Sequence, residues 1–322
     1  MVKNKKVLLI CPKFFGYEEK LFDAINRLGF YVDYLDERPS NKVVFKAILR
    51  LGIRAISDLI NESYYNDFCK RNVKKYDYVL YFNIESINKE ILISLRNSFP
   101  KAKHILYMWD SVKNKPNYLE LTSLFDRCYT FDPKDAENNA ELNYKPLFSC
   151  MKPQSRQKKT FDYSFVGTVH GSRLPILLKL DSMIRERELT SYLYFYYPSR
   201  TLWMLRCIFD KRLKLSYFNK VNFKPLEYKK VESVVRQSKF VIDVPNSDQV
   251  GMTMRNVEVV CAGTKILTTN KTAINTEFYQ DGMIMFFCEN NIVLPYNGVY
   301  NNSEVNYSNY YIDNWLKEIL IS

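Results

Sequence analysis

The chain has 322 residues, which is long enough for two domains of ordinary size. With 47% hydrophobic and 25% charged residues it can bury two substantial cores, and this excludes a disordered chain. Its 47 Lys and Arg outnumber 35 Asp and Glu, so the formal net charge is +12. A basic chain attracts nucleic acid, anionic lipid or phosphorylated ligands, and net charge alone does not choose among them.

The 7 cysteines are scattered and include no CxxC pair, which favours a reducing compartment and argues against a zinc site. The apolar run 7–11 is too short for the core of a signal peptide and is followed by Pro12. No apolar run approaches the roughly 20 residues that a membrane span needs. We therefore expect a cytoplasmic protein without a membrane-spanning segment.

Short apolar runs alternate with amphipathic segments along the first half of the chain. The expected strands are 6–11, 31–35, 77–82, 103–108 and 128–131. The expected helices are 18–28, 43–60, 88–99 and 117–125. This alternation predicts a parallel sheet covered on both faces, with ligands beyond the carboxyl ends of its strands.

A second alternation follows the segment 145–159, whose prolines and basic run are typical of an interdomain linker. The expected strands are 161–166, 191–196, 239–244, 265–269 and 283–287. The expected helices are 173–187, 226–237, 253–262 and 309–321. The sequence thus predicts an α/β fold of two Rossmann-like domains facing a central cleft. Neither domain carries GxGxxG or a P-loop motif, which counts against a dinucleotide dehydrogenase or a P-loop enzyme.

The stretch 243–270 holds the most informative pattern, a strand end followed by a polar loop and a helix start. Gln249 and Gly251 lie in the loop, and Thr253 opens a helix that carries Arg255 and Glu258. A helix N-terminus offers free N–H groups, and an arginine offers a planar fork to phosphate oxygens. The pattern suits a nucleotide diphosphate, with Glu258 accepting from a ribose diol. An ordinary cap with a surface Arg–Glu pair is the alternative.

Another strand-end loop runs from Gly167 to Arg173 and contains His170. Gly167 permits a tight backbone turn, and Arg173 in the first helical turn can pair with a phosphate. His170 can hydrogen-bond a phosphate, and the alternative is a loop histidine without a function. Asp110 follows the fourth expected strand, where ligands gather, and is the leading candidate for a general base. A loop hydrogen bond or a helix cap is the alternative for Asp110.

The run from Gln249 to Glu258, continued by 263–270, resembles the donor-site region of bacterial CgeB-like, capsule and lipopolysaccharide glycosyltransferases of the GT-B fold. Three further segments resemble the same group, namely 108–111, 131–135 and 163–173. The last helix, which contains Trp315, is similar as well. The resemblance covers most of the chain, in the same order.

The resemblance implies an acceptor domain at 1–150, a donor domain at 151–307 and a final helix, 308–322, that packs back across the domains. It implies a hexosyltransferase of surface polysaccharide biosynthesis that uses a UDP-sugar as co-substrate, without a metal or other cofactor. The donor-binding residues are then Gly167, Arg173, Gln249, Gly251, Thr253, Arg255, Glu258 and Asn270, and the catalytic ones are Asp110 and His170. The acceptor-side residues are Gly16, Trp109, Ser111, Asp132 and Asp135.

The resemblance leaves the stereochemistry open. Related retaining families carry a second glutamate before the one that matches Glu258, and Val250 stands at that position. Asp132 and Asp135 are weaker candidates than Asp110 for the base of an inverting mechanism.

Two basic segments suggest contact with the inner face of the plasma membrane, where a lipid-linked acceptor would lie. One is a stripe at four-residue spacing, formed by Lys42, Lys46, Arg50 and Arg54. The other, 196–220, mixes cations and aromatic side chains and includes Trp203 and Arg206. A solvated helix face is the alternative for the stripe, and core packing for the aromatic side chains.

Three other functions remain open from the sequence. A basic nucleic-acid-binding protein has the same charge, although no zinc finger, RNP motif or clear helix-turn-helix is present. A non-catalytic sugar-nucleotide-binding homologue would bind the donor without turnover. A glycan epimerase on the same fold would rearrange a sugar without an acceptor. Nucleic acid is not an expected partner, and the oligomeric state is left open.

Overall fold

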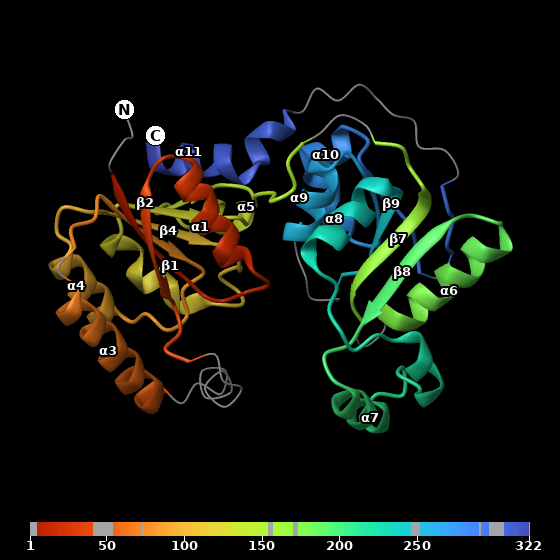
Figure 1. The fold of residues 1–322 in the computed structure, drawn as a ribbon, viewed down its shortest axis with the longest axis horizontal. Coiled ribbons are helices and arrows are strands. Elements are labelled where there is room, and N and C mark those ends of the chain that lie inside the picture. The colour runs from red at the N-terminus through yellow and green to blue at the C-terminus, as the bar shows by residue number, and fades with distance from the viewer. Residues whose placement is uncertain are drawn as a thin grey trace. The chain divides into compact units, whose positions relative to one another are not determined.

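The computed structural model describes residues 5–40, 54–72, 74–153, 157–169, 173–245, 252–289, 291–295 and 306–321 (Figure 1). The chain divides into two compact units. The first comprises Met1–Leu147 together with Ile312–Ser322, and the second comprises Phe148–Tyr311.

The first unit is built on a parallel sheet with the strand order β2-β1-β3-β4-β5-β6. Its strands are β1 (Lys6–Cys11), β2 (Tyr31–Asp36), β3 (Tyr78–Phe82), β4 (Lys103–Met108), β5 (Arg127–Thr130) and β6 (Leu142–Tyr144). Its helices are α1 (Tyr17–Arg27), α3 (Arg54–Arg71), α4 (Lys89–Ser98), η1 (Pro116–Leu124), α5 (Pro133–Asn138) and α11 (Ile312–Ile321). All five residues of β3 are buried, because helices cover both faces of the sheet.

The two faces of this sheet carry different helices. Helices α3 and α4 pack together over one face (Figure 1), where Tyr81 and Leu106 contribute to the core. The neighbouring residues Phe82 and Tyr107 point to the other face, because successive side chains in a strand alternate. There they pack against Trp315 of α11, with ring centroids 6.2 and 4.6 Å from the indole.

Helix α11 belongs to the first unit, although the whole second unit precedes it in the chain. Trp315 is fully buried, and its Nε1 donates to the carbonyl of Pro146 at 2.7 Å. Asp313 forms an ion pair of 2.6 Å with Arg27 of α1. The last helix therefore completes the core and the surface of the first unit.

The second unit has a parallel sheet with the order β11-β10-β9-β7-β8. Its strands are β7 (Phe161–Thr168), β8 (Ser191–Tyr196), β9 (Ser238–Asp243), β10 (Lys265–Thr268) and β11 (Ile284–Phe286). Its helices are α6 (Arg173–Glu186), α7 (Arg200–Phe209), η2 (Leu215–Lys220), α8 (Tyr228–Gln237), α9 (Met254–Cys261), η3 (Lys271–Asn275), α10 (Glu277–Gln280) and η4 (Tyr307–Tyr310). The strand order reverses between β7 and β9, as it does between β1 and β3 in the first unit. Such reversals are where open α/β sheets bind ligands.

Two expectations from the sequence about the first unit need correction. The expected helix 43–60 lies partly outside the described residues, and α3 continues to Arg71 rather than ending at 60. It continues because Tyr65 extends its buried face. The expected helix 117–125 is the 3-10 helix η1, which opens at Pro116.

Candidate functional site

The switch point of the second unit brings Arg173 between two strand ends. Arg173 opens α6, and its guanidinium donates from Nε to the carbonyl of Val244 and from Nη1 to that of Thr168 at 2.8 Å. It thereby fixes the ends of β9 and β7 relative to each other. Burial lowers the pKa of Arg173, and Asp243 opposes this effect while the cationic Arg255 adds to it.

Arg255 reaches the same place from helix α9. Its Nη1 would lie 3.6 Å from a Cβ atom added at Gly167 in β7. The Cζ of Phe165 would lie 3.1 Å from the same Cβ, so a side chain at position 167 would be crowded. The structure thus brings together three predicted donor-site residues, Gly167, Arg173 and Arg255.

A buried carboxyl, Asp243, lies beside the two guanidinium groups. Its Oδ2 accepts from Thr268 Oγ1 at 2.9 Å and from Asn256 Nδ2 at 3.2 Å. Burial raises the pKa of Asp243, and these hydrogen bonds, followed by Arg173 and Arg255, act in the opposite direction. Two guanidinium groups outnumber the one carboxyl at this sheet edge, so the local charge favours binding of an anion.

Helix α9 also presents its N-terminus near this edge. Thr253 is the N-cap, and its Oγ1 accepts from the backbone N–H of Asn256 at 3.1 Å. The cap fixes the first turn, whose remaining N–H groups have no partner within the helix. Thr253 therefore has the capping role that the sequence allowed.

The other predicted donor residues are less open, or lie outside the described part of the chain. Glu258 is buried and accepts from the hydroxyl of Tyr228 at 2.8 Å. Asn270 is the N-cap of η3 and accepts from the N–H of Thr272 at 3.1 Å. Contact of either residue with a nucleotide stays a prediction. His170, Gln249 and Gly251 lie outside the described residues.

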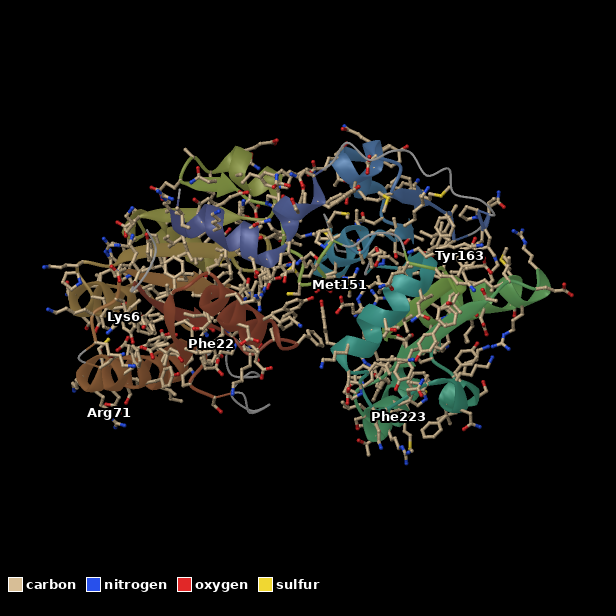
Figure 2. All side chains as sticks on the ribbon, turned by 45° about the horizontal axis from the view of Figure 1, so that its top comes forward. Lys6, Phe22, Arg71, Met151, Tyr163 and Phe223 are labelled. Atoms are coloured by element: carbon tan, nitrogen blue, oxygen red, sulfur yellow. The ribbon has the colours of Figure 1, made fainter. Side chains whose placement is uncertain are left out.

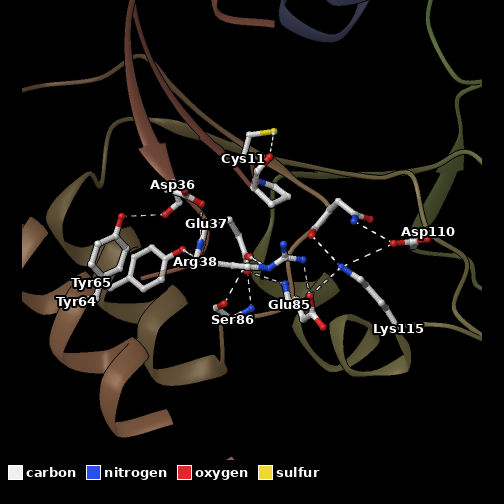
Figure 3. Close-up of polar contacts among 12 residues, drawn as sticks. Cys11, Asp36, Glu37, Arg38, Tyr64, Tyr65, Glu85, Ser86, Asp110 and Lys115 are labelled. Carbon is white, nitrogen blue, oxygen red and sulfur yellow. Dashed lines mark hydrogen bonds and ion pairs between the residues drawn. The ribbon is translucent and has the colours of Figure 1, made fainter. Parts of the chain in front are cut away.

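In the first unit, a charged network lies at the carboxyl ends of β2, β3 and β4 (Figure 3). Glu37 is fully buried just after β2, and its Oε1 accepts from the backbone N–H groups of Glu85, at 2.6 Å, and Ser86. Burial raises the pKa of Glu37, although Lys115, these two N–H groups and Arg38 act against the rise. Glu37 thus holds the loop after β3, although Glu37 itself follows β2, which is not adjacent to β3 in the sheet.

Lys115 and Arg38 connect Glu37 and its loop to Asp110, the candidate base. Arg38 pairs with Glu85 at 2.7 Å, and the ammonium of Lys115 lies 3.6 Å from the same carboxylate. Lys115 also donates to the carbonyl of Asn83 at 3.2 Å and lies 3.8 Å from Oδ2 of Asp110. Burial alone would raise the pKa of Glu85, but Lys115 and Arg38 lower it overall.

Asp110 is held from two sides and remains accessible. Asn83, in the left-handed backbone region with φ 48°, donates from Nδ2 to Oδ2 of Asp110 at 3.1 Å. The Asp110 side chain is 40% exposed. A carboxyl group that is fixed by an amide and an ammonium, and open to solvent, is suited to accept a proton from a bound hydroxyl.

The sequence reasoning missed the members of this network. Glu37 and Arg38 follow one strand directly, and Asn83 and Glu85 follow another, so their positions satisfy the rule that selected Asp110. Polar and charged residues at the ends of these two strands were the available signal. The hydrogen bonds that join these loops, which are far apart in sequence, had no local signature.

Asp132 and Asp135 hold the loops beside Asp110. Asp132 is the N-cap of α5 and accepts from the N–H of Lys134 at 2.9 Å. Asp135 accepts from the N–H of Val112 at 2.7 Å. Burial raises the pKa of Asp135; the hydrogen bond from Val112 lowers this pKa, and the neighbouring Asp132 raises it further. Both carboxyls have structural partners, so a role toward the acceptor stays a prediction.

The remaining predicted acceptor-side residues lie in loops at the same sheet edge. Gly16 has φ 77° and caps α1, next to the loop residue Phe14. The ring of Phe14 stacks on Trp109 with a centroid distance of 6.2 Å, and Phe82 supports Trp109 at 5.7 Å. The carbonyl of Ser111 accepts from the N–H of Lys115 at 3.0 Å. Phe14 and Trp109 thus form an aromatic surface of the kind against which an apolar face of a ligand can pack.

The predicted membrane-facing residues have mixed outcomes. Lys42, Lys46 and Arg50 lie outside the described residues, as does the side chain of Arg54. Trp203 was predicted wrongly, because it is fully buried in the core of the second unit and packs edge-on against Tyr197 at 5.1 Å. Arg206, on the same helix, is exposed.

The described residues include neither a membrane-spanning helix nor a metal-binding cluster. No described helix is long and apolar enough to span a membrane. Within the same residues, no group of three or more His, Cys, Asp or Glu side chains is placed to hold a metal ion.

No protein-family model and no curated protein sequence matches this chain. Solved structures do match it. Alr3699/HepE of Anabaena, solved with UDP and glucose, matches with a TM-score of 0.56 and 9% identity over 98% of this chain and 99% of that one. The UDP-GlcNAc 2-epimerase of Methanocaldococcus jannaschii matches with a TM-score of 0.54 and 12% identity, over 98% and 99%.

WaaG, a glycosyltransferase involved in lipopolysaccharide biosynthesis, matches with a TM-score of 0.50 and 12% identity, over 88% of this chain and 87% of that one. At such identities the likeness shows the fold alone. The predicted fold is confirmed: two parallel-sheet α/β domains of the GT-B type. The CgeB-like, capsule and O-antigen subgroup stays a prediction.

Proposed function

We propose that this protein is a glycosyltransferase that moves a hexose from a nucleoside diphosphate sugar, with UDP as the expected nucleotide, to a glycan or lipid-linked acceptor. The observation that carries the proposal is that two arginines lie together at the switch point of a GT-B fold: Arg255 lies against Gly167, and Arg173 binds the carbonyl of the next residue, Thr168. The likeness to a structure that holds UDP and glucose, and to WaaG, supports a sugar-nucleotide ligand.

In the proposed reaction, the second unit binds the donor. The diphosphate lies against Arg255 and the first turn of α9, and Arg173 holds the strand ends that shape this place. When the anomeric carbon–oxygen bond breaks, the leaving diphosphate gains negative charge. Guanidinium groups and helix N–H groups stabilise that charge in the transition state, and this stabilisation is the main protein contribution to the rate. His170 is proposed to donate a hydrogen bond to the same phosphate group.

The first unit supplies the base and the acceptor side. Asp110 accepts the proton of the attacking hydroxyl while the new carbon–oxygen bond forms, which corresponds to an inverting mechanism. Asn83 and Lys115 orient its carboxylate. Trp109, Phe14 and the loop at Gly16 offer the acceptor an aromatic surface. We propose that the reaction needs neither a metal nor another cofactor.

We further propose that the protein works in the cytoplasm, at the inner face of the plasma membrane, in the synthesis of lipopolysaccharide, O-antigen or capsule. The resemblance of Gln249–Glu258 to the CgeB-like group supports this pathway class. The exposed Arg206 on α7 supports contact with an anionic surface.

The test is a thermal-shift panel of UDP-, GDP-, dTDP- and CMP-sugars with the intact protein, without added metal. One nucleotide class should raise the melting temperature, because a ligand that binds the folded state stabilises it. The variant Arg255→Ala should weaken that ligand about 10- to 100-fold, the range expected for a lost charge-assisted hydrogen bond. The control Arg206→Ala removes an exposed arginine of the same unit. Equal loss in both variants, or no response to any nucleotide sugar, would refute the assignment.

A second candidate function is a sugar-nucleotide epimerase, which the likeness to the Methanocaldococcus jannaschii enzyme favours. The two functions differ in their need for an acceptor. Incubation of the responsive nucleotide sugar with the protein alone, followed by NMR of the sugar, separates them. An epimerase gives a rearranged sugar under these conditions, whereas a transferase leaves the donor unchanged until an acceptor is added.

A further inference from the structure

Helix α7 presents an unusually apolar face to solvent. Trp203 is fully buried and attaches the helix to the core, while Ile208 is 72% exposed and Phe209 80% exposed. At about 100° per residue, the side chains opposite Trp203 form one continuous arc. The exposed apolar residues of this arc are Leu202, Met204, Leu205, Ile208 and Phe209, and Leu215 of η2 is exposed as well.

Cations surround this arc. Between 199 and 220 the chain carries the basic residues Arg200, Arg206, Lys211, Arg212, Lys214 and Lys220. The acidic residue of this segment is Asp210, which pairs with Arg212 at 2.8 Å. Arg200 packs over the ring of Phe223, which Figure 2 labels, at 5.6 Å. Basic residues therefore border the apolar patch on α7 and along the segment that follows it.

The position of α7 relates this patch to the candidate donor site. Helix α7 follows β8 directly, and β8 runs parallel to β7. The chain therefore leaves β8 at the same edge of the sheet where β7 ends in Gly167 and Thr168. Figure 1 shows α7 beyond this edge of the second unit.

We propose that α7 and η2 form a surface that inserts into the headgroup region of an anionic lipid bilayer. An apolar helix face bordered by Lys and Arg is the pattern of an interfacial helix, which buries its apolar side chains below the headgroups. The cations complement the negative potential of anionic lipid. A second copy of this chain is disfavoured on the patch, since pairing would bring two sets of cations together. Nucleic acid would use the cations and leave Ile208 and Phe209 exposed.

This inference rests on the proposed function, because a lipid-linked acceptor places the reaction at a membrane. It deepens that function by locating the membrane contact in the donor unit. It also replaces Trp203 as the membrane-facing residue by Ile208 and Phe209, which lie on the opposite side of the same helix.

The test is sedimentation of the full chain with vesicles of phosphatidylcholine and phosphatidylglycerol in a 3:1 mixture, chosen about as anionic as a bacterial inner leaflet. The protein should bind these vesicles, bind pure phosphatidylcholine vesicles more weakly, and dissociate as salt is added. Ile208→Ser/Phe209→Ser should weaken binding at least about tenfold, because buried side-chain carbons are lost from the bilayer. Arg206→Ser/Lys211→Ser/Lys214→Ser should weaken it by about fivefold per cation removed.

Matched controls separate the patch from general effects of charge and hydrophobicity. Val293→Ser removes an exposed apolar side chain elsewhere in the second unit. Lys152→Ser/Lys179→Ser/Lys229→Ser removes three exposed lysines outside α7 and η2. Both controls should bind vesicles like the parent protein, and all variants should keep the parent melting temperature and far-UV spectrum.

Three results would overturn the proposal. The first is absence of vesicle binding by the parent protein. The second is equal loss in the patch variants and their controls. The third is a patch variant that turns an oligomer into a monomer, or abolishes RNA or DNA binding, without changing vesicle binding. The nucleotide-sugar thermal shift, measured in the same variants, shows separately whether the proposed function holds.

Discussion

Replacing Lys115 by Met should destabilise the first unit by about 2.5–4 kcal/mol. The donated bond to the carbonyl of Asn83, at 3.2 Å, is charge-assisted and contributes about 1.5–3 kcal/mol. The ion pairs with Glu85 and Asp110, at 3.6 and 3.8 Å, add about 0.5 kcal/mol each, because both carboxylates are partly exposed. Methionine keeps the length of the side chain and removes its charge.

The pH dependence distinguishes this explanation from a simple packing defect. The folded pKa of Glu85 lies below its ordinary value of 4.5, so its stabilising contribution is present above pH 4.5 and is lost as the pH falls further. The folded pKa of Glu37 lies above 4.5, so holding it ionised destabilises the fold at neutral pH and protonation relieves this. Lys115 acts favourably on both carboxylates. The stability difference between parent and Lys115→Met should therefore be largest near pH 7 and narrow as the pH falls through 4.5.

The assay is urea unfolding at several pH values, followed by near-UV circular dichroism. Lys113→Met is the control, because it removes an exposed lysine from the same loop. A difference that is constant or grows on acidification would refute the electrostatic account, as would equal destabilisation by Lys113→Met. Transfer activity should fall as well, since Asp110 loses one of its two supports.

Three further changes test other parts of the structure. Burial lowers the pKa of His104 to about 4 from 6.5, so its contribution to stability falls by about 3 kcal/mol between pH 6.5 and 4. In His104→Asn, the urea concentration at the unfolding midpoint should change less with pH over that range. Trp315→Ala should lower the stability of the first unit by about 3–5 kcal/mol, measured by denaturant titration, and an unchanged midpoint would contradict its role in the core. Gly167→Ala should weaken nucleotide-sugar binding in calorimetry while leaving the secondary structure intact, because the added Cβ crowds the site beside Arg255.

The alternation of strands and helices was predictable because each buried parallel strand is a short apolar run bounded by polar residues. The end of α3 was missed because Tyr65 continues the buried face beyond the aliphatic residues on which the expectation depended. Trp203 was misassigned because a tryptophan among cations suits a membrane interface as well as a core. The position of each residue around the helix distinguishes the two environments, since Trp203 lies on the side of the helix opposite Leu205 and Phe209.

The candidate sites were predictable to different degrees. Arg173, Arg255 and Gly167 were found because each lies in a strand-end loop or at a helix start, which local sequence reveals. The support of Asp110 was not found, because Glu37 and the loop at Glu85 are separated by 48 positions and are joined by hydrogen bonds from the backbone N–H groups of Glu85 and Ser86. Such pairing depends on sheet order, and here β1 lies between the two strands involved.

The path of the chain through α11 affects when the first unit can complete its fold. During synthesis the ribosome adds all of Phe148–Tyr311 before it adds the tryptophan that fills the core beneath Phe82 and Tyr107. One apolar face of the N-terminal sheet therefore stays uncovered while the second unit is synthesised and folds. A nascent chain stalled before residue 312 should be recognised by chaperones through its N-terminal half, and a fusion of Met1–Leu147 directly to Ile312–Ser322 should relieve that dependence.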